Sequence, residues 1–161
     1  SIGCSTFSVY TYILTPKFDI RAYVDTIADS VKILCEQHGK TLWVQINIKN
    51  ILICIDCSFV SQVNNNLISN ALRYAKSEVH ISYVSDNNGF YISVSDDGCG
   101  FTKDVLNKAT NPYFTEEKDH SEHFGLGLYI CKILCEHHGG YLKIENCSTG
   151  AKVTAFFKSL D

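Results

Sequence analysis

The most informative stretch of this sequence is Asn66-Leu67-Ile68-Ser69-Asn70-Ala71-Leu72-Arg73-Tyr74. Its apolar residues recur at three- and four-residue steps, which predicts a helix with one face on a core. On such a helix Asn66, Asn70 and Arg73 lie within about 60° of one another at the border of the apolar face. Amide oxygens suit Mg²⁺ and a guanidinium suits phosphate, so these residues are candidates for a phosphate site. A solvated run of asparagines over 64–66 is an equally good explanation of this stretch alone.

A second segment, Asp96-Asp97-Gly98-Cys99-Gly100, follows an expected strand. Glycines at Gly98 and Gly100 allow a tight turn and a close approach of the backbone to a ligand. The carboxylate of Asp96, held just before them, can accept a hydrogen bond from an amino group on a flat ring. Taken alone, the segment is better explained as an ordinary Asp-Gly turn.

A third segment, Gly125-Leu126-Gly127-Leu128, leads into the last long helical pattern. Glycines let backbone amides face an anion, and a helix N-terminus adds positive potential. The segment is not a Walker phosphate loop, because no Gly-Lys-Ser/Thr follows, and it lacks the third glycine of a dinucleotide fingerprint. Each segment is weak evidence by itself, but the three in this order indicate a nucleotide site.

The hydrophobic periodicity of the whole chain predicts the order α, β, β, α, β, β, long loop, α, β, β. Helices are expected over about 19–39, 58–76 and 126–138, with a short one near 103–108, and strands over about 42–48, 51–55, 78–84, 90–95, 141–146 and 152–158. This order predicts an α/β (α+β) two-layer sandwich, a mixed sheet of about five to six strands covered on one face by three helices. The polar stretch over about 101–124 is long for a loop in a compact domain, and such loops are commonly functional.

The composition fits one globular domain of 161 residues with 45% hydrophobic residues. A net charge of −3 argues against nonspecific binding to nucleic acid or anionic lipid, and no apolar run is long enough to span a membrane. The eight cysteines are expected to be reduced thiols, since Cys54 and Cys57 lack the second close pair that a zinc site needs. The chain has no methionine and begins at Ser1, so we expect an excised or processed piece.

From about Asp19 to Lys158 the chain resembles the catalytic, ATP-binding domain of bacterial sensor histidine kinases. That domain belongs to the superfamily shared with gyrase B, the Hsp90 chaperones and MutL. The segments that carry the resemblance are Asp56–Ala75 (N box), Asp96–Phe101 (G1 box), Asn111-Pro112-Tyr113-Phe114 (F box), His123–Leu128 (G2 box) and Glu136–Gly140 at the end of the following helix.

For the N box, the resemblance implies that Asn70 ligates a Mg²⁺ ion that bridges the phosphates. It implies that Asn66 lies near the γ-phosphate and orients the reacting groups, so that Asn66 and Asn70 are the catalytic residues. Arg73 would touch phosphate, and Tyr74 would pack on the adenine.

For the glycine segments, the resemblance implies that Asp96 accepts from the adenine amino group, directly and through water. Gly98 and Gly100 would leave room for the base, and Gly125 and Gly127 would expose amides to the phosphates. The other expected nucleotide-binding residues are Phe114, Leu126 and Leu128.

Two residues depart from the family pattern. His123 stands where the G2 box usually begins with glycine, and Thr110 stands where the F box usually begins with an aromatic residue. Both lie in the segment 101–124 that would close over ATP as a lid. His120 and His123 sit there among acidic residues, which indicates a solvated loop rather than a metal site.

The implied reaction is transfer of the γ-phosphoryl group of Mg·ATP to a histidine on a separate dimerisation domain. No histidine in this chain lies in a phosphoacceptor pattern, so residues 1–17 are expected to be the linker from that missing upstream domain, and 18–161 the catalytic domain. The further partner would be a response regulator, and the location the cytoplasmic part of a membrane-anchored kinase, with no direct membrane contact. Two alternatives remain: a serine kinase of the anti-sigma factor type, and a non-catalytic module that senses ATP.

Overall fold

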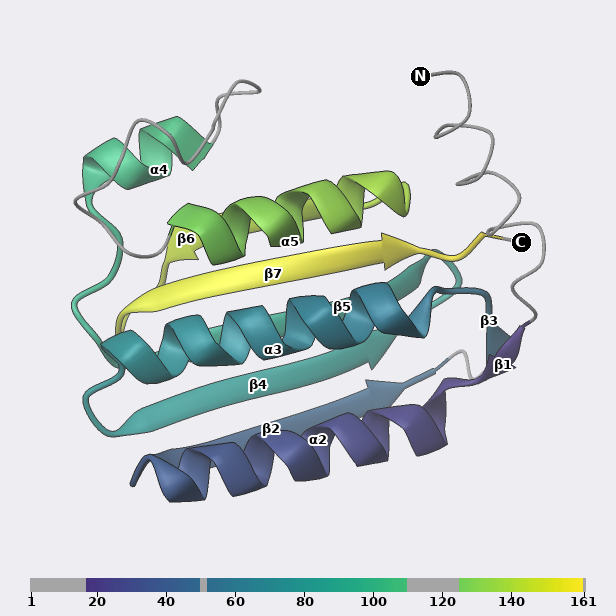
Figure 1. Ribbon diagram of the computed structural model, residues 1–161, viewed down its shortest axis with the longest axis horizontal. Helices are drawn as coiled ribbons and strands as arrows, with labels where there is room; N and C mark the ends of the chain where they lie inside the picture. The colour runs from purple at the N-terminus through teal and green to yellow at the C-terminus, as the bar shows by residue number, and fades with distance from the viewer. Residues whose placement is uncertain (1–16, 50–51, 110–124, 161) are drawn as a thin grey trace.

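The computed structural model describes residues 17–49, 52–109 and 125–160, which form a sheet with helices on one face (Figure 1). The sheet has five strands in the order β2-β4-β5-β7-β6. The strands are β2 (Thr41–Ile48), β4 (Glu78–Ser85), β5 (Gly89–Asp96), β6 (Tyr141–Asn146) and β7 (Ala151–Lys158). Strand β2 pairs with β4 in parallel and the other pairs are antiparallel, so the predicted mixed sheet is confirmed.

Three long helices form the second layer: α2 (Ile20–Gln37), α3 (Cys57–Tyr74) and α5 (Gly125–His137). Helix α3 runs between the other two across the sheet, and the short helix α4 (Lys103–Ala109) lies at one end of the molecule (Figure 1). The predicted two-layer sandwich with three helices on one face is therefore confirmed.

Local sequence signals set the ends of these helices. Asp19 caps α2, where its side chain accepts from the N–H of Arg21, and Asp56 caps α3 in the same way. Gly39 and Gly139 follow α2 and α5 with φ angles of 66° and 74°, a left-handed conformation that glycine adopts without steric cost. The helix boundaries expected from the sequence agree closely with those of the structure.

The strand expected over 51–55 differs from the structure. Within the described residues 52–55 of that run, Leu52–Ile53 alone forms a strand, β3, and it pairs with an unpredicted two-residue strand, β1 (Phe18–Asp19), outside the five-stranded sheet. The following apolar residues are buried, and the backbone of Cys54 bonds to Ser159 and Leu160 near the C-terminus. The run is thus apolar because it lies in the core, which gives the same sequence signal as a buried strand.

The core lies between the sheet and the helices, and three cysteines belong to it. Cys35, Cys131 and Cys135 have no exposed surface and act as small apolar residues. Burial raises the pKa of Cys131 to about 12, which keeps this thiol protonated at neutral pH. None of the seven cysteines that the structure describes forms a disulfide. Among the described residues, none of the helices combines the length and the apolar character needed to cross a membrane.

Candidate nucleotide-binding site

Asn66 on α3 faces the first turn of α5. A Cβ atom added to Gly127 would lie 3.8 Å from Oδ1 of Asn66, so the amide oxygen stands in front of this turn. The first N–H groups of a helix have no acceptor within the helix, and they carry its positive dipole end. The fold thus joins two of the segments that the sequence indicated, an asparagine on one helix and the glycine-containing start of another.

The rest of the asparagine helix leads from this point to the end of β5. Asn70 and Tyr74 are partly buried, and Arg73 is exposed near the end of α3. A Cβ atom on Gly98 would collide with the backbone carbonyl oxygen of Tyr74. The end of α3 is therefore in contact with the glycine turn, which joins the first and second indicated segments.

The asparagines over 64–66 are not a solvated run. Asn64 is 1% exposed, and its Oδ1 accepts a hydrogen bond of 2.8 Å from the hydroxyl of Tyr83 in the core. Asn65 is exposed and Asn66 is partly buried. Three consecutive asparagines thus face the core, the solvent and the start of α5, which follows from the 100° step between helical residues.

Asp96 is a buried carboxylate at the end of β5, with only 4% of its surface exposed. Its Oδ1 accepts from the N–H of Gly98 at 2.8 Å, and the N–H of Ala151 also donates to the carboxylate. Burial raises the pKa of Asp96, while these backbone donors act in the opposite direction. A carboxylate offers about four acceptor positions, so one held by two backbone donors can also accept from a ligand.

The two glycines of the turn are required by contacts within the protein. Gly100 has a φ of 79°, and a Cβ atom there would lie 2.9 Å from Oδ1 of Asn146. At Gly98 the obstacle is the carbonyl of Tyr74. These contacts explain both glycines without any ligand, because the chain itself fills the space where a Cβ atom would lie. The expectation that the two glycines leave room for a base stays a prediction.

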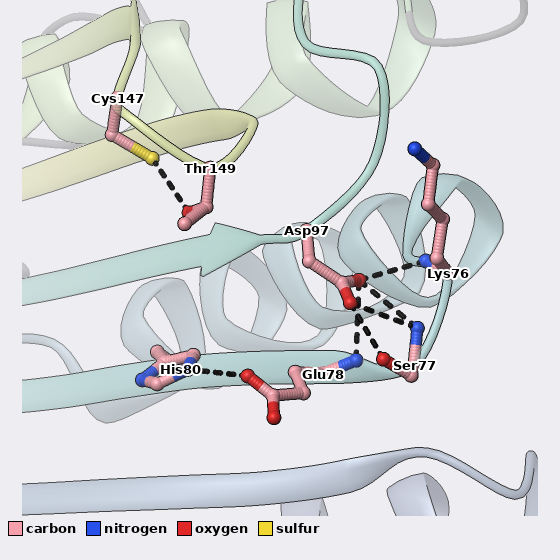
Figure 2. Close-up of polar contacts among 7 residues, drawn as sticks. All are labelled: Lys76, Ser77, Glu78, His80, Asp97, Cys147 and Thr149. Atoms are coloured by element: carbon pink, nitrogen blue, oxygen red, sulfur yellow. Dashed lines mark hydrogen bonds and ion pairs between the residues drawn. The ribbon is translucent and has the colours of Figure 1, made fainter.

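Asp97 has the most hydrogen bonds of this region, although no sequence motif assigned it a role (Figure 2). Its carboxylate accepts from the backbone N–H groups of Lys76, Ser77 and Glu78 and from the hydroxyl of Ser77. These hydrogen bonds hold the pKa of Asp97 well below its usual range. Two adjacent aspartates cannot be told apart by residue type, so only their positions in the fold distinguish them.

The other expected site residues lie outside the described residues, at the start of α5 or in the core. Phe114, Thr110 and His123 lie outside the described residues, as does most of the expected lid, of which α4 forms an early part. Gly125 and Leu126 begin α5. Leu128 is 2% exposed and packs in the hydrophobic core, so its side chain contributes to the seating of α5 on the sheet.

Two side-chain amides of α3 could supply oxygen ligands to a metal ion: Asn66, which faces Gly127 of α5, and Asn70, one helical turn further along α3. Within the described parts of the chain, no three His, Cys, Asp or Glu side chains lie together as a metal site. Mg²⁺ usually keeps waters and takes few protein ligands when phosphates also bind it. Neutral amide oxygens on one helix face are therefore suitable ligands for a Mg²⁺ ion that is bound together with phosphates.

The chain is similar to known proteins over most of its length. The family model described as "Histidine kinase-, DNA gyrase B-, and HSP90-like ATPase" matches residues 55–160. The chain is 30% identical over 125 residues to the sensor histidine kinase WalK of Bacillus subtilis, and 28% identical over 127 residues to the sensor histidine kinase CpxA of Escherichia coli K12. These matches cover 73% and 77% of this chain but only 20% and 28% of the two relatives.

The fold is also that of a solved structure, a nucleotide-free catalytic domain of the histidine kinase ThkA. The TM-score is 0.69 at 20% sequence identity, over 89% of this chain and 96% of that one. The structural match reaches beyond the region of the family model and takes in most of the described chain. Together with the buried Asp96 and the asparagine helix facing α5, these matches assign the domain to a family: the chain belongs to the histidine kinase-, DNA gyrase B- and HSP90-like ATPases and is homologous to sensor histidine kinases.

Proposed function

We propose that this domain binds Mg·ATP between α3, the end of β5 and the start of α5, and transfers the γ-phosphoryl group to a histidine. The observation that carries the proposal is that Asn66 faces Gly127 while Asp96 is buried near the other end of α3. At about 1.5 Å per residue, Asn66 and Tyr74 are about 12 Å apart along the helix. An extended nucleoside triphosphate has a comparable length, with phosphates at one end and a base at the other.

At the phosphate end, Asn66 would lie near the γ-phosphate. Arg73 lies in the last turn of α3, beside Tyr74, and its long side chain would reach from there to a phosphate oxygen. The N–H groups of Gly125 and Gly127 would donate to the phosphates at the positive end of α5. Asn70 would hold the Mg²⁺ ion, which when bound neutralises part of the phosphate charge. Phosphoryl transfer depends mainly on positioning and charge stabilisation, and neutral and cationic donors supply both.

At the base end, Asp96 would accept from the exocyclic amino group of adenine, and Tyr74 would pack on the ring. The turn with Gly98 and Gly100 would lie beside the base. A buried, fixed carboxylate discriminates strongly between bases, because a base that presents an acceptor would leave two acceptors facing each other. Phe114, Leu126 and the main chain of Leu128, whose side chain lies in the core, would complete the nucleotide pocket.

The phosphoacceptor would be a histidine of a separate dimerisation domain. His138 is a poor candidate, since it is fully buried and both ring nitrogens are engaged, with Asp56 and with Lys158. His80 lies in β4 and contacts Glu78 (Figure 2). We therefore propose that residues 1–17 connect the catalytic domain, 18–161, to a dimerisation domain of a membrane-anchored kinase, and that a response regulator receives the phosphoryl group.

Two measurements test the proposal. Calorimetric titration of Mg·ATP into the chain should show binding that Asp96→Asn removes. Incubation with γ-labelled ATP and a dimerisation domain from a homologous sensor kinase should then label that domain through an acid-labile bond, as phosphohistidine requires. An acid-stable product would favour the serine kinase alternative, and binding without any transfer would favour the ATP-sensing alternative.

A further inference from the structure

Two side chains outside the glycine turn at 98–100 bond to the main chain on either side of it. Asp97 binds the loop that follows α3, and Asn146 binds the residue that follows Gly100. We propose that Asp97 and Asn146 are positioning residues, which hold this turn in its nucleotide-binding conformation before the nucleotide arrives. The proposal rests on the nucleotide site described above and adds two residues to it.

On the first side, Asp97 acts on the segment between α3 and β4 (Figure 2). Its Oδ1 accepts from the N–H groups of Lys76 at 2.8 Å, Ser77 at 3.0 Å and Glu78 at 3.1 Å, and its Oδ2 accepts from the Ser77 hydroxyl at 2.7 Å. Charge-assisted hydrogen bonds of this length are stronger than those between neutral groups. One carboxylate therefore joins the end of β5 to three consecutive residues beyond Tyr74.

The same segment is also held from the opposite direction. The ammonium group of Lys40 donates to the carbonyl oxygens of Ala75 and Lys76, each at 2.9 Å. Backbone donors thus bond to Asp97 and backbone acceptors bond to Lys40. Tyr74 directly precedes this segment, and its carbonyl oxygen lies so close to Gly98 that a Cβ atom there would collide with it. A shift of the segment would therefore press on the turn.

On the second side, Asn146 is the last residue of β6 and bonds to the main chain of Phe101. Its Oδ1 accepts from the N–H of Phe101 at 2.7 Å, and its Nδ2 donates to the carbonyl oxygen of Phe101 at 2.9 Å. One side-chain amide therefore satisfies both polar groups of a backbone residue, as a neighbouring strand would. This arrangement also explains Gly100, where a Cβ atom would lie 2.9 Å from Oδ1 of Asn146.

A glycine turn needs such restraints because glycine has the largest conformational freedom of any residue. If only a fraction of the molecules has the binding conformation, the apparent dissociation constant rises by the inverse of that fraction. Loss of one restraint that leaves the turn correctly formed in about a tenth of the molecules would weaken binding roughly tenfold. The loss of affinity should appear for ligands that carry a base and not for phosphates alone, since the phosphate end of the site is built on α3 and α5.

The experiment compares two probes, Mg·ADP, which carries a base, and inorganic tripolyphosphate with Mg²⁺, which does not. Asn146→Ala and Asp97→Ala should each weaken ADP binding roughly tenfold and change tripolyphosphate binding less than about twofold. Two matched controls should bind ADP within about threefold of the wild type. Asp97→Asn keeps an oxygen for the backbone donors, and Glu145→Ala changes the neighbour of Asn146 on the same strand.

Each result bears on a defined statement. Alanine variants that bind ADP as the wild type does, or that lose both probes equally, would overturn the positioning role while the nucleotide site stands. A wild-type protein that binds neither probe would overturn the proposed function itself, and the positioning role with it.

Hydrogen exchange of the wild type tests the proposal without any variant. The amides of Ser77 and Phe101 should be protected in the nucleotide-free protein nearly as well as in the ADP complex. Protection that develops only when ADP is added would contradict a turn that is formed in advance.

Discussion

Nε2 of His138 accepts a hydrogen bond of 2.9 Å from the backbone N–H of Asp56. The other ring nitrogen, Nδ1, therefore carries the proton and donates to the carbonyl oxygen of Lys158 at 2.9 Å. His138 directly follows α5, and its buried imidazole thus joins the end of this helix to the residue that caps α3 and to the end of β7. The two helices that would hold the phosphates are fixed to each other through a titratable group.

This contact predicts a stability that depends on pH. Burial lowers the pKa of His138, so the unfolded chain, with an ordinary value near 6.5, binds the proton more readily than the folded protein does. Above about pH 6.5 the free energy of unfolding contains the full contribution of His138. As the pH falls from there toward the pKa of the folded state, this contribution is lost by at most about 1.4 kcal/mol per pH unit. Urea unfolding at pH 7.5 and pH 5.5 measures the change in the free energy of unfolding.

The matched variant for this test is His138→Gln, which cannot titrate. Its unfolding free energy should change less than that of the wild type between the two pH values. Equal pH dependence in the two proteins would show that other groups cause the loss of stability at acidic pH.

The buried pair of Tyr83 and Asn64 predicts a cost for removing one partner alone. Tyr83→Phe leaves the Oδ1 of Asn64 without its 2.8 Å hydrogen bond in the core, which should lower the unfolding free energy by about 1–3 kcal/mol. The double variant Tyr83→Phe with Asn64→Leu should lose less than the sum of the two single losses. Chemical denaturation of all four proteins completes the cycle, and strict additivity would argue against the coupling.

Asp96 and Asn70 should be needed for nucleotide binding. Saturating Mg·ATP should raise the thermal midpoint of the wild type, because a ligand that binds only the folded state stabilises it. Asp96→Asn and Asn70→Asp should each remove most of that rise. Differential scanning fluorimetry measures the thermal midpoint with and without Mg·ATP. A rise of wild-type size in both variants would refute the assignment of these two residues.

Gly127 and Gly98 should respond to alanine in opposite ways. At Gly127 a Cβ atom has its nearest neighbour 3.8 Å away, so Gly127→Ala should stabilise α5 by about 0.5–1 kcal/mol. If Gly127 serves the phosphates, the same variant should bind Mg·ATP more weakly. Gly98→Ala should destabilise the nucleotide-free protein, because its Cβ meets the carbonyl oxygen of Tyr74.

The measurements for the glycines are the unfolding free energy and the ATP dissociation constant of both variants. A stable Gly127→Ala protein with unchanged ATP affinity would mean that the glycine is not needed for phosphate binding. A fully stable Gly98→Ala protein would mean that the contact between α3 and the turn can relax.

Much of the fold could be predicted because its signals are local. Asp19, Asp56 and Gly39 mark helix ends through interactions within a few residues, and the 3.6- and 2-residue periods mark the elements between them. The pairing of β1 with β3 could not be predicted, since two-residue strands have no period. Likewise the order β2-β4-β5-β7-β6 depends on contacts between segments far apart in the chain.

For the site, the sequence by itself determined which segments carry the chemistry: the asparagine helix, the turn after β5 and the glycines before α5. Their residue types and order were sufficient, because amide, carboxylate and glycine each have a distinct chemistry. Only the tertiary structure decided that Asn64 belongs to the core while Asn66 faces α5, and that Asp96 is buried while Asp97 binds a loop. The role of Asn146 could not be read from its neighbours, since its partner Phe101 is 45 positions away and meets it only in the folded chain.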